Sequence, residues 1–312
     1  MLKGLALTPP VVGRIAIGKV VTKDGARRPD KDDEFTITTQ VQQPDGWKLH
    51  PLDAALRSSP DAKLRAIPVR LLFNDPELNL RASYSAFDRA TGRPLCVGDG
   101  ETCRRSTASG VQTLACPSPE GCELALKTNC KPYGRLNVRI GEEDELGSFV
   151  FRTTGFNSIR TLAARLRYFQ ALSGDQVSAL PLELRLRGKS TAQSFRTPIF
   201  YVDLTVRSGS TLAQALEAAR EEVGARKTAG FDQVALDQAA RAGIAAGAFE
   251  ESSEEGHSSI EEFFPDEPEQ VRPESLQQQD PAKPQPLGSN LQRLAAQARG
   301  AKAKEIGLVA SG

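Results

Sequence analysis

The sequence predicts an α+β protein with a mainly antiparallel β core, an inserted four-cysteine loop, C-terminal helices and a disordered acidic tail. Three observations predict this class. Alternating apolar and polar residues, many of them β-branched, recur through the first 208 residues, as in half-buried strands. All five cysteines of the 312-residue chain fall between positions 96 and 130. From residue 249 onward the chain becomes acidic and rich in Pro and Gln, a composition that cannot bury a core.

Residues 1–208 are expected to form the β-rich core. A charged loop separates the first two predicted strands, and the turn signal Asn74-Asp75-Pro76 separates the next two. An acidic turn at 141–147 is expected to close a hairpin after the cysteine loop. The predicted strands span residues 11–21, 34–41, 66–73, 78–87, 135–140, 148–152, 182–189 and 195–207.

The cysteine loop, residues 96–130, predicts a structural zinc site, because four thiolates close a tetrahedral shell around Zn²⁺ and leave no position for a substrate. Cys116, Cys122 and Cys130 stand beside prolines and glycines that tighten turns around an ion. Cys96, at the end of a predicted strand, is chosen as the fourth ligand. Cys103 is the alternative, since two arginines follow it in an expected exposed loop.

The spacing of the cysteines leaves other interpretations open. The intervals of 6, 12, 5 and 7 residues differ from the paired C-x2-C pattern of zinc ribbons. Disulfides fit poorly with an odd number of cysteines and no secretory signal. An iron–sulfur cluster and a set of reduced thiols without metal remain alternatives.

Two groups of residues resemble a known family. The first is Gly13-Arg14-Ile15-x-Ile17-Gly18, followed by Arg28-Pro29 and Phe35-x-Ile37-Thr38. The second is Cys116-Pro117, Cys122 and the run Cys130-Lys131-Pro132-Tyr133-Gly134-Arg135-Leu136. Together they resemble the recombination directionality factor-like proteins of phages and mobile elements, over residues 11–140 and more loosely to residue 207.

The resemblance implies a role in DNA recombination. Members of this family are linked to large serine integrases, which they switch from integration to excision by binding the integrase on DNA. Similar proteins also occur beside genes for strand annealing and exonuclease functions. The expected function is a non-enzymatic, cytoplasmic accessory factor that binds a recombinase or integrase and contacts DNA. The alternative is a single-stranded DNA-binding recombination protein with an acidic partner-docking tail.

Helical patterns begin after the predicted hairpin. Ser158 is expected to cap a helix whose apolar stripe contains Ile159, Leu162, Leu166 and Phe169. Residues 209–248 are expected to form a helical appendage. In it, Thr211 and Gln214 have the spacing of a capping box, Gly224 is expected to end the first helix, and Asp232 is expected to cap a second helix to about Ala246.

A basic segment is the candidate nucleic-acid interface. Residues 151–208 contain nine Lys or Arg against three acidic residues, and aromatic rings interleave with them. Arginine forks bind phosphates and aromatic rings stack on bases. The competing interpretation is that the arginines are ordinary solvated residues. The candidates are Arg152, Arg160, Arg165, Arg167, Arg185, Arg187, Lys189, Arg196 and Arg207.

The charge is divided unequally along the chain. Residues 1–248 carry 34 Lys and Arg against 27 Asp and Glu, whereas residues 249–312 carry 6 against 12. Residues 249–290 are expected to be a disordered acidic, Pro- and Gln-rich linker, and residues 291–312 a short basic helix. Ile260, Phe263 and Phe264 form an apolar island in the linker and are candidate partner-binding residues.

Catalytic motifs are missing from the sequence. The two histidines, His50 and His257, are isolated, and no zinc-protease, nucleophile-elbow or phosphate-binding pattern occurs. A metal-dependent hydrolase built on His50, Asp32-Asp33 or Glu142-Glu143 is the remaining enzymatic alternative. No apolar run approaches the roughly 18 to 20 residues of a membrane span, so no membrane partner is expected.

Overall fold

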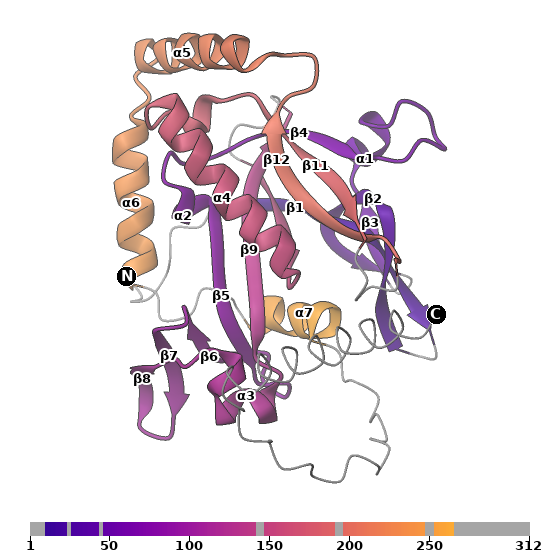
Figure 1. Ribbon diagram of the computed structural model, residues 1–312, viewed down its shortest axis with the longest axis vertical. Coiled ribbons are helices and arrows are strands. Elements are labelled where there is room, and N and C mark those ends of the chain that lie inside the picture. Colours follow the sequence, from indigo (N-terminus) through magenta and orange to yellow (C-terminus); the bar gives the residue numbers. More distant parts are fainter. Residues whose placement is uncertain are drawn as a thin grey trace, which may run out of the picture. The chain divides into compact units, whose positions relative to one another are not determined.

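The computed structural model describes residues 10–23, 26–43, 46–141, 147–190, 196–246 and 253–264. It confirms a mixed α+β protein with a large, mostly antiparallel sheet (Figure 1). The strands follow the order β3-β2-β1-β10-β9-β5-β6-β7-β8, and β4, β11 and β12 branch from this path at β9. The strands are β1 (Val11–Lys23), β2 (Ala26–Gln43), β3 (Gly46–Leu49), β4 (Ala66–Arg70), β5 (Leu80–Phe87), β6 (Pro94–Gly98), β7 (Thr102–Thr107), β8 (Gly110–Ala115), β9 (Lys131–Ile140), β10 (Ser148–Thr153), β11 (Leu182–Lys189) and β12 (Ile199–Val206).

Helices connect and cover these strands. Within the described ranges, none of them is both long and apolar enough to cross a membrane. The helices are α1 (Pro51–Ala55), α2 (Pro76–Asn79), α3 (Glu123–Thr128), α4 (Phe156–Ser173), α5 (Leu212–Thr228), α6 (Gln233–Ala246) and α7 (Ser253–Phe263).

β9 is the strand at which the parts of the sheet meet. It pairs antiparallel with β10 through residues 134–138, which confirms the predicted hairpin, and with β5 through residues 131–136. Arg139 and Ile140 continue the pairing with β4. β10 in turn pairs parallel with β1, so the N-terminal strands join the same sheet.

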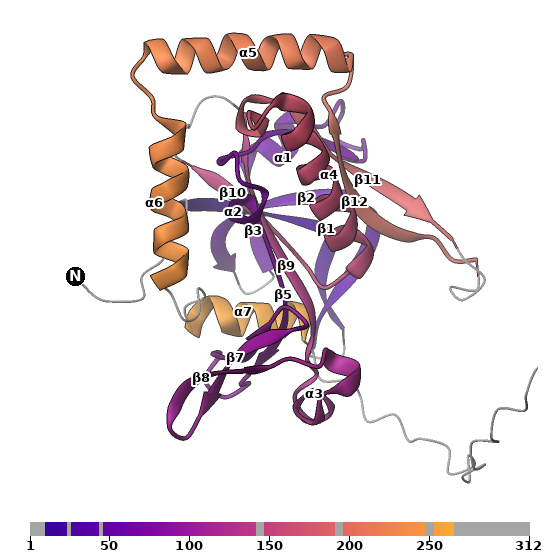
Figure 2. The ribbon, with the colours of Figure 1, turned by 60° about the vertical axis from the view of Figure 1, so that its left-hand side comes forward.

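The main core lies on one face of these strands. Alternate residues of β1, β2, β9 and β10 pack with residues of β4, β11, β12 and α4. Figure 2 shows the arrangement of these helices and strands from a second side. Leu162 and Leu166 of α4 are fully buried, and each contributes about 2 kcal/mol of burial. The largest fully buried side chains are Phe35, Ile37, Ile67, Leu71, Leu136, Phe151, Leu162, Leu166, Leu180, Leu182, Leu184 and Leu204.

The structure corrects the predicted start of α4. The apolar stripe is confirmed, but the helix begins at Phe156 and Gly155 occupies the N-cap. Ser158 lies inside the first turn, where its buried hydroxyl accepts a hydrogen bond from the Val202 amide at 3.1 Å. Its side chain therefore ties the helix to β12 rather than capping it.

The helices after β12 largely follow the prediction. The capping box of Thr211 and Gln214 is present at the start of α5. Gly224 does not end this helix, which continues to Thr228, because a glycine costs only about 1 kcal/mol within a helix. Asp232 accepts a hydrogen bond from the Ala235 amide at 2.9 Å, in the predicted N-terminal position of α6.

Residues 253–264 contradict the prediction of a disordered linker over 249–290. They include the helix α7 and Phe264, which follows it, and both Ile260 and Phe264 are buried against Phe87 and Tyr133. The distant strands β5 and β9 supply the apolar surface that the local composition lacks. The rest of the predicted linker and the predicted helix at 291–312 lie outside the described residues.

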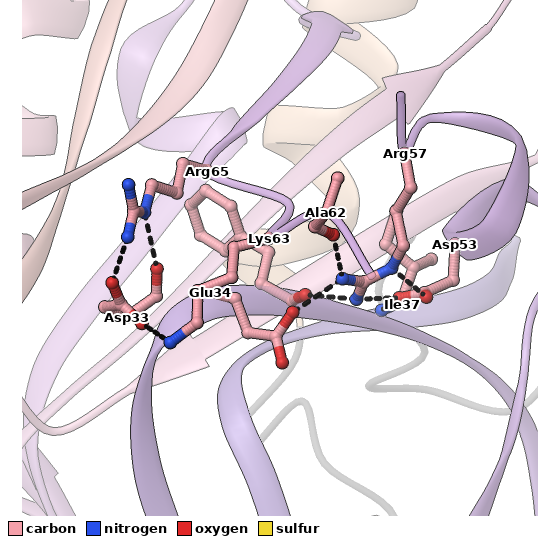
Figure 3. A network of polar contacts seen from close by, with 9 residues as sticks. Asp33, Glu34, Ile37, Asp53, Arg57, Ala62, Lys63 and Arg65 are labelled. Carbon is pink, nitrogen blue, oxygen red and sulfur yellow. Dashed lines mark hydrogen bonds and ion pairs between the residues drawn. The ribbon is translucent and has the colours of Figure 1, made fainter. Parts of the chain in front are cut away.

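A polar network fastens the segment after β3 to β2 (Figure 3). The Asp53 carboxylate is buried and accepts hydrogen bonds from the Ile37 amide at 2.8 Å and from Arg57 Nε at 2.9 Å. Arg57 also donates to Glu34 at 2.6 Å and to the Ala62 carbonyl at 2.8 Å. These carboxylates raise the pKa of Arg57, with Asp53 the main cause.

We expect Arg57→Ala to lower the free energy of unfolding by about 3 kcal/mol, because it removes the charged donor shared by the Asp53 and Glu34 carboxylates. Urea denaturation measures this loss. The control is Lys63→Ala, which removes an ion-pair partner of Asp33. The Lys63 side chain is 45% exposed, so this substitution should lower the free energy of unfolding by at most about 1 kcal/mol. Equal losses in the two variants would contradict the role given to burial.

Candidate functional site

The cysteine segment forms a small folded unit at one end of the sheet. β6, β7 and β8 form a meander, and α3 follows it before the chain enters β9. Cys103 lies on β7 and is only 3% exposed, so the prediction of an exposed loop at this position is wrong. Pairing of β7 with β6 and β8 gives Cys103 neighbours that the sequence does not reveal.

Small residues make room for the thiols. Ala86 on β5 lies opposite Cys96 and is packed in one cluster with Cys96, Cys103, Cys116 and Cys130. A Cβ atom added to Gly98 would lie 2.7 Å from Cys103 Cβ and 2.9 Å from Cys116 Sγ. A larger side chain at either position would therefore separate the sulfurs.

The thiols differ in their tendency to ionise. Burial, with a hydrogen bond to Cys96 next in importance, raises the pKa of Cys103 to about 11. Burial and then the charges of Cys96, Cys122 and Cys116 raise the pKa of Cys130 to about 12. The pKa of Cys122 is lowered, mainly by a hydrogen bond from the Ala125 amide, and Arg105 Nη2 lies 3.7 Å from its sulfur.

Cys96 and Cys116 thus lie near enough to both Cys103 and Cys130 to affect the pKa of each. None of them forms a disulfide. Among the residues that the structure describes, no three His, Cys, Asp or Glu side chains are arranged to hold a metal ion. Three of the four predicted ligands, Cys96, Cys116 and Cys130, pack in one cluster, and zinc coordination by these residues and Cys122 remains a prediction.

His50 has a structural role. It is the N-cap of α1, where Nδ1 accepts a hydrogen bond from the Leu52 amide at 3.2 Å, and its ring packs edge-on against Phe149. Asp33 pairs with Lys63 and Arg65. Glu142 and Glu143 lie outside the described residues.

The predicted basic segment does not form one surface. Arg165 on α4 and Arg187 on β11 both bind the buried Asp203 carboxylate, at 3.0 and 3.1 Å. Arg185 pairs with Glu183. Arg167 pairs with Glu77 at 3.6 Å, and Lys189 donates to Asn157 at 2.7 Å. The remaining basic residues of the predicted set are Arg160, Arg196 and Arg207.

Arg152 belongs to a different surface, on the face of the sheet that points away from the main core. Register places Arg152 of β10 opposite Arg135 of β9, and Arg135 opposite Arg81 of β5. Arg14 of β1 pairs with Val150, two residues before Arg152. With Lys131 on β9, these residues define what we call the cationic face: Arg14, Arg81, Lys131, Arg135 and Arg152.

Of these five residues, only Arg152 is among the predicted nucleic-acid-binding residues. A signal was available for two of them, because Lys131, Tyr133 and Arg135 alternate at a period of two and therefore share one face of a strand. Arg14 and Arg81 join them only through strand order, which no local pattern shows. Charge counts over a continuous segment cannot find such a surface.

The helix α7 packs on the cationic face. Glu262 pairs with Arg14 at 2.5 Å, and the hydroxyls of Ser259 and Tyr133 are hydrogen bonded at 2.9 Å. Phe263 and Phe264 contact the Tyr133 ring. The three residues predicted to bind a partner, Ile260, Phe263 and Phe264, therefore make contacts within the chain.

We expect Cys122 to be alkylated first in reduced protein stripped of metal, because its lowered pKa gives more thiolate at neutral pH. Cys103 and Cys130, whose pKa values are raised, should react slowly. Mass spectrometry of peptides after timed iodoacetamide treatment measures the order. Unfolded protein is the control and should show similar rates at all five positions. Equal alkylation rates of Cys122, Cys103 and Cys130 in the folded protein would contradict the pKa differences described above.

A comparison with protein families identifies the family of this chain. The family model described as Gp3-like, recombination directionality factor-like, matches residues 12–207, which is more than half of the chain. The match spans the cysteine segment and most of the sheet, and it ends before α5. No curated protein and no solved structure matches the chain. The chain belongs to the Gp3-like family of recombination directionality factor-like proteins.

Proposed function

We propose that this protein is a non-enzymatic accessory factor in the recombination of a mobile element, where it regulates a recombinase or integrase bound to DNA. Membership of the recombination directionality factor-like family carries this proposal. The structural role of His50 fits it, because this candidate residue of the hydrolase alternative caps α1 through its Nδ1 atom.

The hairpin β7–β8 is the proposed contact for the recombinase. β8 stands at the end of the strand order and is exposed along its whole length. The exposed side chains Val111, Leu114 and Leu126 lie on this hairpin and on the neighbouring α3. An exposed edge strand offers unpaired amides and carbonyls to a partner, and apolar side chains beside it add specificity.

We further propose that Cys96, Cys116, Cys122 and Cys130 bind structural zinc. The convergence of the thiols and the space beside Ala86 and Gly98 support this, because a closed thiolate shell would fix the hairpin relative to β5 and β9. Cys96 is kept as the proposed fourth ligand, with Cys103, which packs in the same cluster, as the alternative.

The function is tested with purified protein and the serine integrase of the same element. We expect the protein to increase excision and to suppress integration on DNA substrates for each reaction. Val111→Asp should weaken integrase binding by about 2 kcal/mol, or roughly 30-fold, if the hairpin is the contact. The matched control is Val234→Asp, at a valine on α6 that is 64% exposed. No effect of the wild-type protein on either reaction would contradict the proposed function.

The metal proposal has its own measurement. Elemental analysis of protein purified without chelator should give about one zinc per chain. Zinc should be lost in Cys122→Ser and Cys130→Ser and kept in Cys103→Ser. Loss in Cys103→Ser, with Cys96→Ser unaffected, would reverse the choice of the fourth ligand. Absence of zinc from the wild-type protein would contradict the site.

A further inference from the structure

Three arginines of the cationic face lie close to one another. Arg81, Arg135 and Arg152 lie directly abreast on three neighbouring strands, and such strands are about 4.8 Å apart. Like charges opposite each other destabilise a sheet. Burial and the charge of Arg135 lower the pKa of Arg81 to about 10. Such a row of guanidinium groups suits the phosphates of a nucleic acid.

Aromatic rings lie among these cations. The guanidinium of Arg14 stacks over Trp47 at 4.1 Å, and Arg135 lies 5.9 Å from the Tyr133 ring. Phe87 packs edge-on against Tyr133. Alternating cations and rings on a sheet are the arrangement with which proteins bind single-stranded nucleic acids, since cations meet phosphates and rings stack on bases.

α7 supplies both kinds of group to this face. Its Glu262 carboxylate pairs with Arg14, where a phosphate would be bound. Phe264 stacks near Phe87, with ring centres 5.0 Å apart, and lies under the Lys131 ammonium at 4.7 Å. The acidic and aromatic side chains of the helix thus occupy the positions of phosphate and base.

A small apolar cluster, separate from the main core, attaches α7 to the sheet. The buried apolar residues of the helix belong to this cluster together with Phe87 and Tyr133. A pocket of about 290 Å³ between the helix and the sheet is lined by Arg14, Trp47, Arg152, Glu262 and Phe263. Small peripheral clusters open at lower free energy than a main core.

We propose that the cationic face binds single-stranded nucleic acid and that α7 is a displaceable internal cover that competes for it. This inference rests on the proposed function in taking DNA strands of the recombining complex as the ligand. The protein would then bind DNA weakly alone and tightly once a partner or an exposed strand displaces α7.

Gly256 offers a way to open the face without changing charge. A Cβ atom at this position would overlap the backbone oxygen of Gly92, so we expect Gly256→Ala to prevent docking of α7 while improving its helix propensity. The matched control is Gly224→Ala on α5, where an added Cβ meets nothing within 4 Å. Phe264→Ser, which removes a ring from the same cluster, is the second opening variant.

Opening and binding are measured separately on the full chain. Acrylamide quenching of Trp47, the only tryptophan, reports displacement of α7. Anisotropy of fluorescein-labelled oligothymidine across a salt series reports binding. We expect acrylamide to quench Trp47 fluorescence more readily in Gly256→Ala than in wild type and Gly224→Ala. We also expect Gly256→Ala to bind oligothymidine about ten-fold tighter than either, with a steeper salt dependence. Adding Arg135→Ala should weaken that binding and reduce the salt slope by about one.

Each other outcome overturns part of the proposal. Greater quenching without tighter binding removes the nucleic-acid assignment. Unchanged quenching and binding in both opening variants remove the role of α7 as a cover. Tighter binding of duplex than of oligothymidine contradicts a single-stranded ligand. The excision assay on the same wild-type protein keeps these failures distinct from a failure of the proposed function, because it does not depend on opening by substitution.

Discussion

The alternation of side chains along β9 is the constraint on which the rest of the structure depends. Gly134, Leu136 and Val138 face the main core, where the missing side chain of Gly134 lets Ile159 of α4 approach the strand. Tyr133 and Arg135 face the other way and meet α7 and the neighbouring arginines. A shift of one residue in register would exchange these two sets, so the pairing of β9 with β5 and β10 determines both the core and the candidate binding surface.

Local sequence patterns predict most of the helices and strands, but they do not predict which strands are neighbours in the sheet. The strands of the hairpin β9–β10, the stripe of α4 and the capping box of α5 were all predicted, because each depends on residues within one or two turns or strands. The order of the strands brings together residues more than a hundred positions apart, and no periodicity encodes that order. The cationic face was missed for this reason, whereas Arg152 was assigned to the wrong surface by a charge count.

The same distinction explains two of the errors of local reasoning. Cys103 was placed in an exposed loop because arginines follow it, although pairing of β7 on both edges buries its side chain. The segment containing α7 was assigned to a disordered linker because its own residues are acidic. Both assignments ignored surface contributed by distant strands, and burial against such surface is what orders a polar segment.

The cysteine cluster and the docking surface of α7 lie back to back on the ends of β5 and β9. Ala86 packs with Cys96 on one face of β5, and the next residue, Phe87, packs with Phe264 on the other. The chain enters β9 directly after Cys130, and Lys131 and Tyr133 then contact α7. Because adjacent residues of one strand serve both sites, a metal that fixed the cysteines would also fix the positions of Phe87 and Tyr133. The strand ends therefore provide a direct physical connection between the hairpin proposed to meet the recombinase and the helix proposed to cover the nucleic-acid surface.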